Sequence, residues 1–128
     1  MDSKEYKFFQ WSKLPASLGY AMEGIKVVWQ TQQNFRFHVL AAFIAILLGT
    51  IFSLDKFEWL ILIVVIAGML VIEIINSAIE VTIDLITEEV HPLAKKAKDM
   101  AAGAVVIYAA MSVLIGIIIF FPKIWSLF

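Results

Sequence analysis

The sequence predicts an all-α integral membrane protein with three transmembrane helices and an amphipathic surface helix near its N-terminus. Of the 128 residues, 62% are hydrophobic and 16% are charged, a balance outside the usual range of soluble globular domains. Three apolar runs are each long enough, at roughly 20 residues, to cross the hydrocarbon core of a bilayer. We expect a single membrane domain, residues 1–128. The net charge of −1 gives no reason to expect a nucleic-acid partner.

Residues 1–30 are predicted to form the surface region. Five large apolar side chains recur there at spacings of three and four residues and occupy an arc of about 80° on a helix: Leu14, Leu18, Met22, Ile25 and Trp29. Pro15 suits the first turn of such a helix, where its missing N–H does no harm. Lysines outside the stripe can meet anionic headgroups, so we expect contact with membrane lipids. A helix packed on other helices of the protein would show the same pattern.

The three predicted bundle helices cover residues 35–54, 57–87 and 97–121. The first follows a polar segment that ends at His38, which we interpret as a boundary residue without chemistry. The second apolar run meets its first charge at Glu73, too early to have crossed the bilayer, so the helix must continue past that residue. Pro92 is expected in the connection that precedes the third helix.

The distribution of basic residues predicts the orientation. With the N-terminus inside, the outer segments hold only Lys56 and Lys123, and the inner segments hold the rest: Lys4, Lys7, Lys13, Lys26, Arg36, Lys95, Lys96 and Lys98. We therefore expect a multi-pass protein of an inner (plasma) membrane. Residues 73–84 and 95–99 would then lie on its cytoplasmic side.

A polar stripe interrupts the second span. Glu73, Asn76, Glu80 and Asp84 fall within an arc of about 80° on one helix face. Ionisable groups at membrane depth usually mark a functional site. A lone polar residue in a span is often only a hydrogen-bond partner for another helix, but four on one stripe favour a site.

The residue types in this region predict phosphoryl transfer. Clustered carboxylates without cysteine suit a hard cation, above all Mg²⁺, which also binds substrate phosphates. The lysines of residues 95–99 can hold phosphate oxygens at a helix N-terminus, although such a run also serves as a topology signal. Glu73 is the deepest carboxylate and is the candidate general base for an alcohol. The sequence has no P-loop, so these parts would act without one.

Two motifs in this region resemble a known family. They are Glu-Ile-Ile-Asn-Ser-Ala-Ile-Glu-x-x-x-Asp over residues 73–84 and Ala-Lys-Asp-Met-Ala-Ala-Gly-Ala-Val over residues 97–105. The pair closely resembles the prokaryotic diacylglycerol kinase family, and the second motif is similar to the undecaprenol kinase branch. The resemblance extends from about Lys13 onward. It implies a homotrimer in the bacterial cell membrane that transfers the γ-phosphate of ATP to a lipid alcohol at the cytoplasmic interface.

The resemblance also implies roles for individual residues. Glu73 matches the general base, and Glu80 matches a metal ligand. The residues expected around the nucleotide are Lys13, Tyr20, Asn76, Lys98 and Asp99. Gln32 is a second candidate metal ligand but departs from the family pattern, which has glutamate there; an amide oxygen binds Mg²⁺ more weakly. Lys13 departs too, because some members have arginine.

The acceptor remains open at this point. Undecaprenol is the predicted acceptor and diacylglycerol the alternative, since both present only apolar surface to the spans. Two other interpretations remain. A small ion-coupled transporter would use Glu73 and Glu80 as ion sites but would not need the lysine cluster. The second interpretation is a noncatalytic subunit of a membrane assembly.

Overall fold

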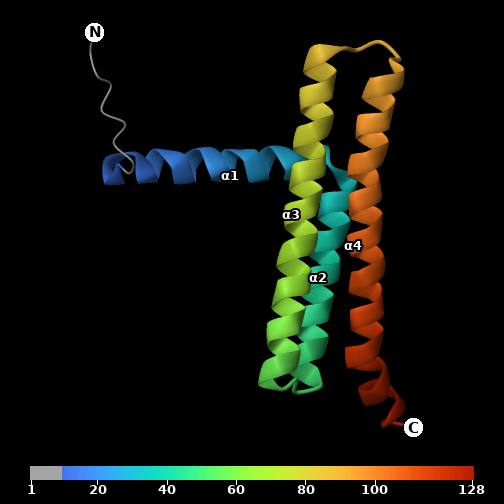
Figure 1. Ribbon diagram of the computed structural model, residues 1–128. Coiled ribbons are helices and arrows are strands. Elements are labelled where there is room, and N and C mark those ends of the chain that lie inside the picture. The colour runs from blue at the N-terminus through green and yellow to red at the C-terminus, as the bar shows by residue number, and fades with distance from the viewer. Residues whose placement is uncertain (1–9) are drawn as a thin grey trace.

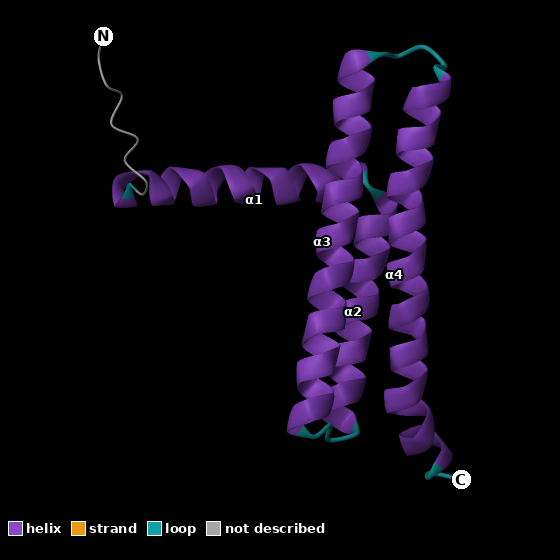
Figure 2. Ribbon diagram, viewed as in Figure 1, coloured by secondary structure: helices purple, strands orange, loops and turns teal. Residues whose placement is uncertain are grey.

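The computed structural model of the protein describes residues 10–128 (Figure 1). These residues form helices joined by short loops, with no strand among them (Figure 2). A short 3₁₀ turn leads into four long helices: α1 (Leu14–Thr31), α2 (Gln33–Ile51), α3 (Lys56–Ile86) and α4 (Pro92–Trp125). The all-α prediction is confirmed, and residues 1–9 of the predicted surface region lie outside the described residues.

The helices form an open bundle with one projecting arm. α2, α3 and α4 run side by side, and α1 projects sideways from them (Figure 1). α3 packs against both α2 and α4, whereas the backbones of α2 and α4 do not approach each other closely. α3 and α4 continue well beyond the level at which α1 meets α2 (Figure 1). α3 is therefore the central helix of the chain.

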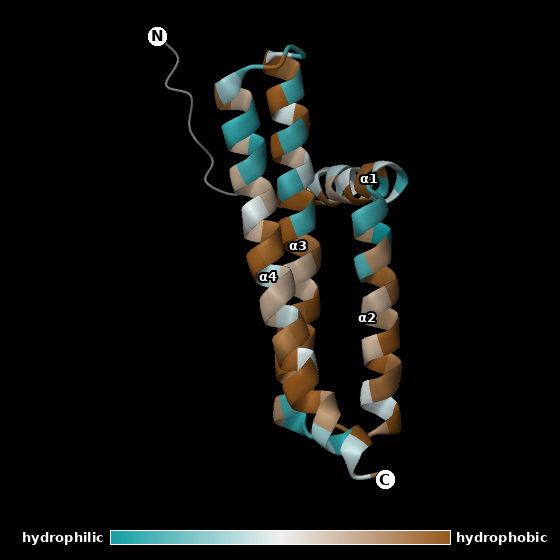
Figure 3. Ribbon diagram, turned by 90° about the vertical axis from the view of Figure 1, so that its right-hand side faces the viewer, coloured by the Kyte–Doolittle hydropathy of each residue, from teal (hydrophilic) through white to brown (hydrophobic). Residues whose placement is uncertain are grey.

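Within residues 10–128, three helices are long and apolar enough to span a membrane, as predicted. α2 has 19 residues, close to the roughly 20 that a span requires. α3 and α4 have 31 and 34 residues. At a rise of 1.5 Å they reach about 46 and 51 Å, which exceeds the roughly 30 Å hydrocarbon core. Their excess length carries the polar residues beyond α1, which Figure 3 shows as hydrophilic ends.

Local sequence explains where α1, α2 and α3 are joined. Gln32 is extended, with φ −111° and ψ 107°, so the chain turns sharply between α1 and α2. At the other end of α2, Ser53 has a positive φ of 52°, which takes the backbone out of the helix. α3 then begins with a capping box: Asp55 Oδ1 accepts from the Glu58 N–H at 2.9 Å, and Glu58 Oε2 accepts from the Asp55 N–H at 3.0 Å.

Three predicted helix boundaries require correction, and one of them is the end of α4, which continues through Pro122 to Trp125 rather than ending at residue 121. α2 ends at Ile51 rather than residue 54, because Ser53 and Leu54 form the turn. α4 begins at Pro92 rather than residue 97. Proline was assigned to the connection, but it occupies the first turn of the helix, where a missing N–H breaks no hydrogen bond. His91 Nδ1 caps this end by accepting from the Leu93 N–H at 3.1 Å.

The chain has a small core beside the α2–α3 turn. Leu54, Leu62 and Ile119 are buried there. α2 approaches closely, since a Cβ atom at Gly49 would lie 2.9 Å from both the Leu54 and the Trp59 side chains. Further along, the Tyr108 hydroxyl of α4 donates to the Val64 carbonyl of α3 at 3.1 Å. These contacts hold three helices together at one end.

Elsewhere, large apolar side chains point outward. Phe43 of α2 is 71% exposed and Ile107 of α4 is 74% exposed, and many others resemble them. An apolar surface of this extent is unstable in water and is expected where lipid or another membrane helix covers it. The exposed faces of the bundle helices therefore agree with a membrane protein.

Candidate active site

The polar stripe of α3 runs from the bundle interior to the surface. Glu73 is 3% exposed, Asn76 and Glu80 are half-buried, and Asp84 is exposed. Ser77 is buried beside Glu73, and its hydroxyl donates to the Glu73 carbonyl at 2.9 Å. A substrate approaching from the polar end would meet Asp84 first and Glu73 last.

Glu73 is a buried carboxylate with unused bonding capacity. Its Oε1 atom accepts no hydrogen bond from the described residues. The nearest partner is His38 of α2, whose Nε2 lies 3.4 Å from Oε1, which is ion-pair distance but does not meet hydrogen-bond geometry. A buried polar atom without a partner is costly and commonly marks a place that a ligand completes. Glu73 therefore keeps an acceptor oxygen that the described residues leave without a hydrogen bond.

Asn76 and Glu80 form the middle of the stripe. The Asn76 Nδ2 group donates to Glu80 Oε1 at 3.4 Å, a long hydrogen bond. Asn76 Oδ1 is buried and accepts no hydrogen bond within residues 10–128. The pair thus offers an amide oxygen and a carboxylate, the hard oxygen donors that Mg²⁺ prefers.

The predicted phosphate-binding residues lie at the start of α4, opposite the exposed end of the stripe. Lys98 Nζ lies 2.6 Å from Asp84 Oδ1, and Lys95 Nζ lies 2.6 Å from Asp99 Oδ2. The four residues border a polar cavity of about 250 Å³ under the α3–α4 loop. Lys98 is thus brought to the acidic stripe, whereas Asp99 is paired within α4.

The described residues of a single chain do not assemble a metal centre by themselves. No group of three His, Asp or Glu side chains within residues 10–128 is close enough to hold a metal. Gln32, the second predicted ligand, lies at the α1–α2 junction and is half-buried. Glu80 and Asn76 fit Mg²⁺ by donor type, and its remaining positions would fall to water and nucleotide phosphates.

The structure does not bring Lys13 and Tyr20 to this site within one chain. Both are exposed, Lys13 directly before α1 and Tyr20 in its second turn. Figure 1 shows this end of α1 pointing away from the bundle. With 18 residues at 1.5 Å each, α1 extends about 27 Å. Their nucleotide-binding role stays a prediction.

His38 is the residue that the sequence interpretation missed. It was assigned to a membrane boundary, yet its ring faces Glu73. The spacing from the turn indicates this contact, because His38 lies 17 residues before Asp55 and Glu73 lies 18 residues after it. Two antiparallel helices that leave the same turn place such residues at the same height. Phe37 supports the ring edge-on, with centroids 5.6 Å apart.

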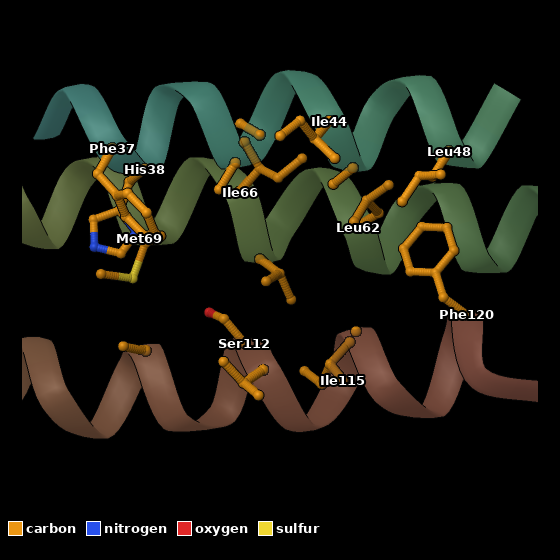
Figure 4. A pocket seen from close by; sticks show the side chains of 17 residues that line it. Phe37, His38, Ile44, Leu48, Leu62, Ile66, Met69, Ser112, Ile115 and Phe120 are labelled. Carbon is orange, nitrogen blue, oxygen red and sulfur yellow. The ribbon is translucent and has the colours of Figure 1, made fainter. Parts of the chain in front are cut away.

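Next to His38 lies an apolar groove, which we name the α2–α4 groove. Side chains from all three bundle helices enclose about 460 Å³. His38 and Met69 lie at one end and Phe120 at the other, and Figure 4 shows the side chains pointing into the space between the helices. His38 and Ser112 are the polar residues of a lining that is otherwise apolar. The groove is thus a hydrophobic space, and the His38 at one end of it lies next to Glu73.

Comparison with known proteins gives the family. A profile of prokaryotic diacylglycerol kinases matches residues 19–120. The chain is 44% identical over 123 residues to an undecaprenol kinase of Bacillus subtilis, covering 96% of this chain and 99% of that protein. It is 42% identical over 92 residues to a diacylglycerol kinase of Helicobacter pylori, covering 72% of each chain.

A third relative, a diacylglycerol kinase of Escherichia coli, is 29% identical over 117 residues, covering 91% of this chain and 93% of that protein. The matches extend over the stripe of α3 and the start of α4, where the two motifs lie. The chain therefore belongs to the prokaryotic diacylglycerol kinase family and is a lipid kinase.

Proposed function

We propose that this protein transfers the γ-phosphate of ATP to undecaprenol at the cytoplasmic face of the bacterial cell membrane. The observation that carries the proposal is the position of Glu73. It lies one turn beyond Met69, at the end of the α2–α4 groove, and it begins the polar stripe that leads to Lys98. A lipid alcohol and a nucleotide would reach this carboxylate from opposite directions.

The membrane orientation supports the cytoplasmic side. Lys95, Lys96 and Lys98 lie at the same end of the bundle as the stripe, and Lys56 and Lys123 lie at the other. The positive-inside rule then places the stripe toward the cytoplasm, where ATP is available. α1 would lie along this interface, with its exposed apolar stripe in the lipid.

Glu73 would act as the general base. It would take the proton of the acceptor hydroxyl as the hydroxyl oxygen attacks the γ-phosphorus, and the bond to the β–γ bridging oxygen would break. A buried carboxylate is held in place by its surroundings, so most of the catalysis would be positioning and charge neutralisation. This role requires Oε1, which accepts no hydrogen bond from the described residues, or its neighbouring oxygen to face the hydroxyl.

Asn76, Glu80, Lys98 and Asp99 would hold the magnesium–nucleotide. Bound Mg²⁺ would neutralise charge that develops on the phosphates. Glu80 and the Asn76 amide oxygen would supply oxygen donors, and Gln32 would supply a neutral one from the α1–α2 junction. Lys98 would exchange its contact with Asp84 for a phosphate oxygen.

A homotrimer would complete this arrangement. The extensive exposed apolar faces of the bundle helices leave surface for other copies of the chain to cover. Lys13 and Tyr20, which lie far from the stripe in their own chain, would contact nucleotide in a neighbouring copy. The trimer thus accounts for two predicted residues that one chain leaves apart.

The acceptor is tested by direct competition. Purified protein is given radiolabelled ATP, Mg²⁺ and an equimolar mixture of undecaprenol and diacylglycerol, and labelled lipids are separated. We expect most of the label in undecaprenyl phosphate. Predominant label in phosphatidic acid would instead assign the chain to diacylglycerol, the substrate named for the Helicobacter pylori relative.

A further inference from the structure

We propose that His38 is a proton relay that acts through Glu73, removing the proton that Glu73 takes from each acceptor hydroxyl. The proposal rests on the proposed function, because it concerns the return of that base to its working state. It is carried by the contact between His38 Nε2 and Glu73 Oε1 at 3.4 Å and by the difference in exposure between the two side chains.

The reaction produces a proton that must leave. Transfer from ATP to an alcohol breaks the O–H bond of the acceptor and the bond from the γ-phosphorus to the bridging oxygen, and it forms one new P–O bond. The products are a phosphorylated lipid, ADP and a proton, which rests on Glu73. A protonated Glu73 cannot accept the next proton, so each turnover requires its removal.

The surroundings of Glu73 point to His38 as the exit. The Glu73 side chain is 4% exposed and that of His38 is 21% exposed, so the imidazole is the more accessible of the two groups. The α3 neighbours of Glu73, Met69 and Ser77, are buried and do not titrate near neutral pH. An imidazole ring can accept a proton at one nitrogen and release one from the other, which suits histidine to a relay.

The charged groups around His38 leave this role open. On α3 the facing group is Glu73, and the groove lining from α3 and α4 is apolar apart from Ser112. Arg36, two residues earlier on α2, is exposed. The imidazole would accept the Glu73 proton at Nε2 and then give a proton to water from the resulting cation. No step requires a reactant beyond the lipid, ATP and water.

The test separates the first turnover from those that follow. Rapid mixing of protein with ATP, Mg²⁺ and lipid alcohol is compared for wild type, His38→Gln and His38→Asn, with Thr50→Ala at the other end of α2 as the control. A relay is not needed until Glu73 has been protonated. We expect both His38 variants to show a burst of about one product per site and then a steady rate lowered about 100-fold.

The opposite results would overturn the relay. A steady rate within about threefold of wild type in either His38 variant would show that His38 carries no proton. Equal slowing of the first and later turnovers would show that His38 is needed for the transfer itself. A wild-type protein without lipid phosphorylation would instead refute the proposed function, so the two failures are distinguishable.

His38→Ala adds a measurement that packing alone would not affect. Imidazole is small enough for the groove beside residue 38 and should restore the steady rate, whereas 1,2,4-triazole, with the same shape and much weaker basicity, should not. Equal rescue by the two rings would mean that they only fill space, which would contradict the relay.

Discussion

The two halves of α3 differ in how fully their polar groups are used. At the α2–α3 turn, Asp55 and Glu58 cap each other, and Glu58 also pairs with Lys123 at 3.1 Å. In the middle of α3, Glu73 Oε1 and Asn76 Oδ1 are buried without hydrogen bonds from the described residues. The polar groups at the turn are thus satisfied within a single chain, whereas the polar stripe keeps two unused acceptor oxygens.

Beyond Glu73 and His38, the largest expected effect comes from removing a charge beside the polar stripe. Lys98→Ala should lower kcat/KM for ATP by about 10- to 100-fold, because it removes a charged hydrogen-bond donor to phosphate. Lys56→Ala, the same change at the α2–α3 turn, serves as the control in steady-state kinetics. Equal losses in the two variants would show that the polar stripe and the α2–α3 turn do not differ in function.

A smaller effect should follow from changing the predicted metal ligands. Glu80→Gln should raise the Mg²⁺ concentration for half-maximal activity by about tenfold, because a neutral oxygen replaces a carboxylate. Gln32→Glu should lower it, since it introduces the carboxylate usual in the family. Magnesium titrations of activity measure both shifts. Unchanged titrations in both variants would mean that the metal is held elsewhere.

The contact that joins α3 to α4 should affect stability rather than catalysis. A Cβ atom at Gly68 would overlap the Tyr108 hydroxyl, so Gly68→Ala should displace that ring and break its bond to Val64. We expect a loss of about 1–2 kcal/mol in the free energy of unfolding. Gly103→Ala is the matched control, because its added Cβ meets nothing within 4 Å. Thermal unfolding in detergent would show no difference between them if the contact were unimportant.

The smallest effect is expected at the end of the bundle that holds the α2–α3 turn. Lys123→Ala removes the pairing with Glu58 but leaves the capping box, so the unfolding free energy should fall by only about 0.5 kcal/mol. Activity per folded molecule should not change. A marked loss of activity would show that this end contributes to the reaction.

The sequence predicted what depends on local pattern and missed what depends on register between helices. The apolar runs and the polar stripe of Glu73, Asn76, Glu80 and Asp84 are properties of single helices, and they predicted the spans and a candidate site. The contact between His38 and Glu73 requires α2 and α3 to be aligned first. The α4 start was wrong because Pro92 serves a loop and a helix N-terminus equally well.

The pairing of Lys98 with Asp84 is also a contact that depends on the register between two helices. The two residues lie 14 positions apart, on different helices, and their contact depends on how the α3–α4 loop folds back. The sequence also predicts that Lys13 and Tyr20 share one site with the polar stripe. The projection of α1 separates them within a chain, because the extended Gln32 turns the backbone at the α1–α2 junction.

The most direct test makes the same chemical change in the polar stripe and at the α2–α3 turn. Glu73→Gln and Glu58→Gln are compared with wild type for nucleotide binding and for transfer of labelled phosphate from ATP to undecaprenol. The account predicts that Glu73→Gln folds and binds nucleotide but loses about 10²- to 10⁴-fold in transfer, while Glu58→Gln stays close to wild type. Transfer retained by Glu73→Gln would contradict the account.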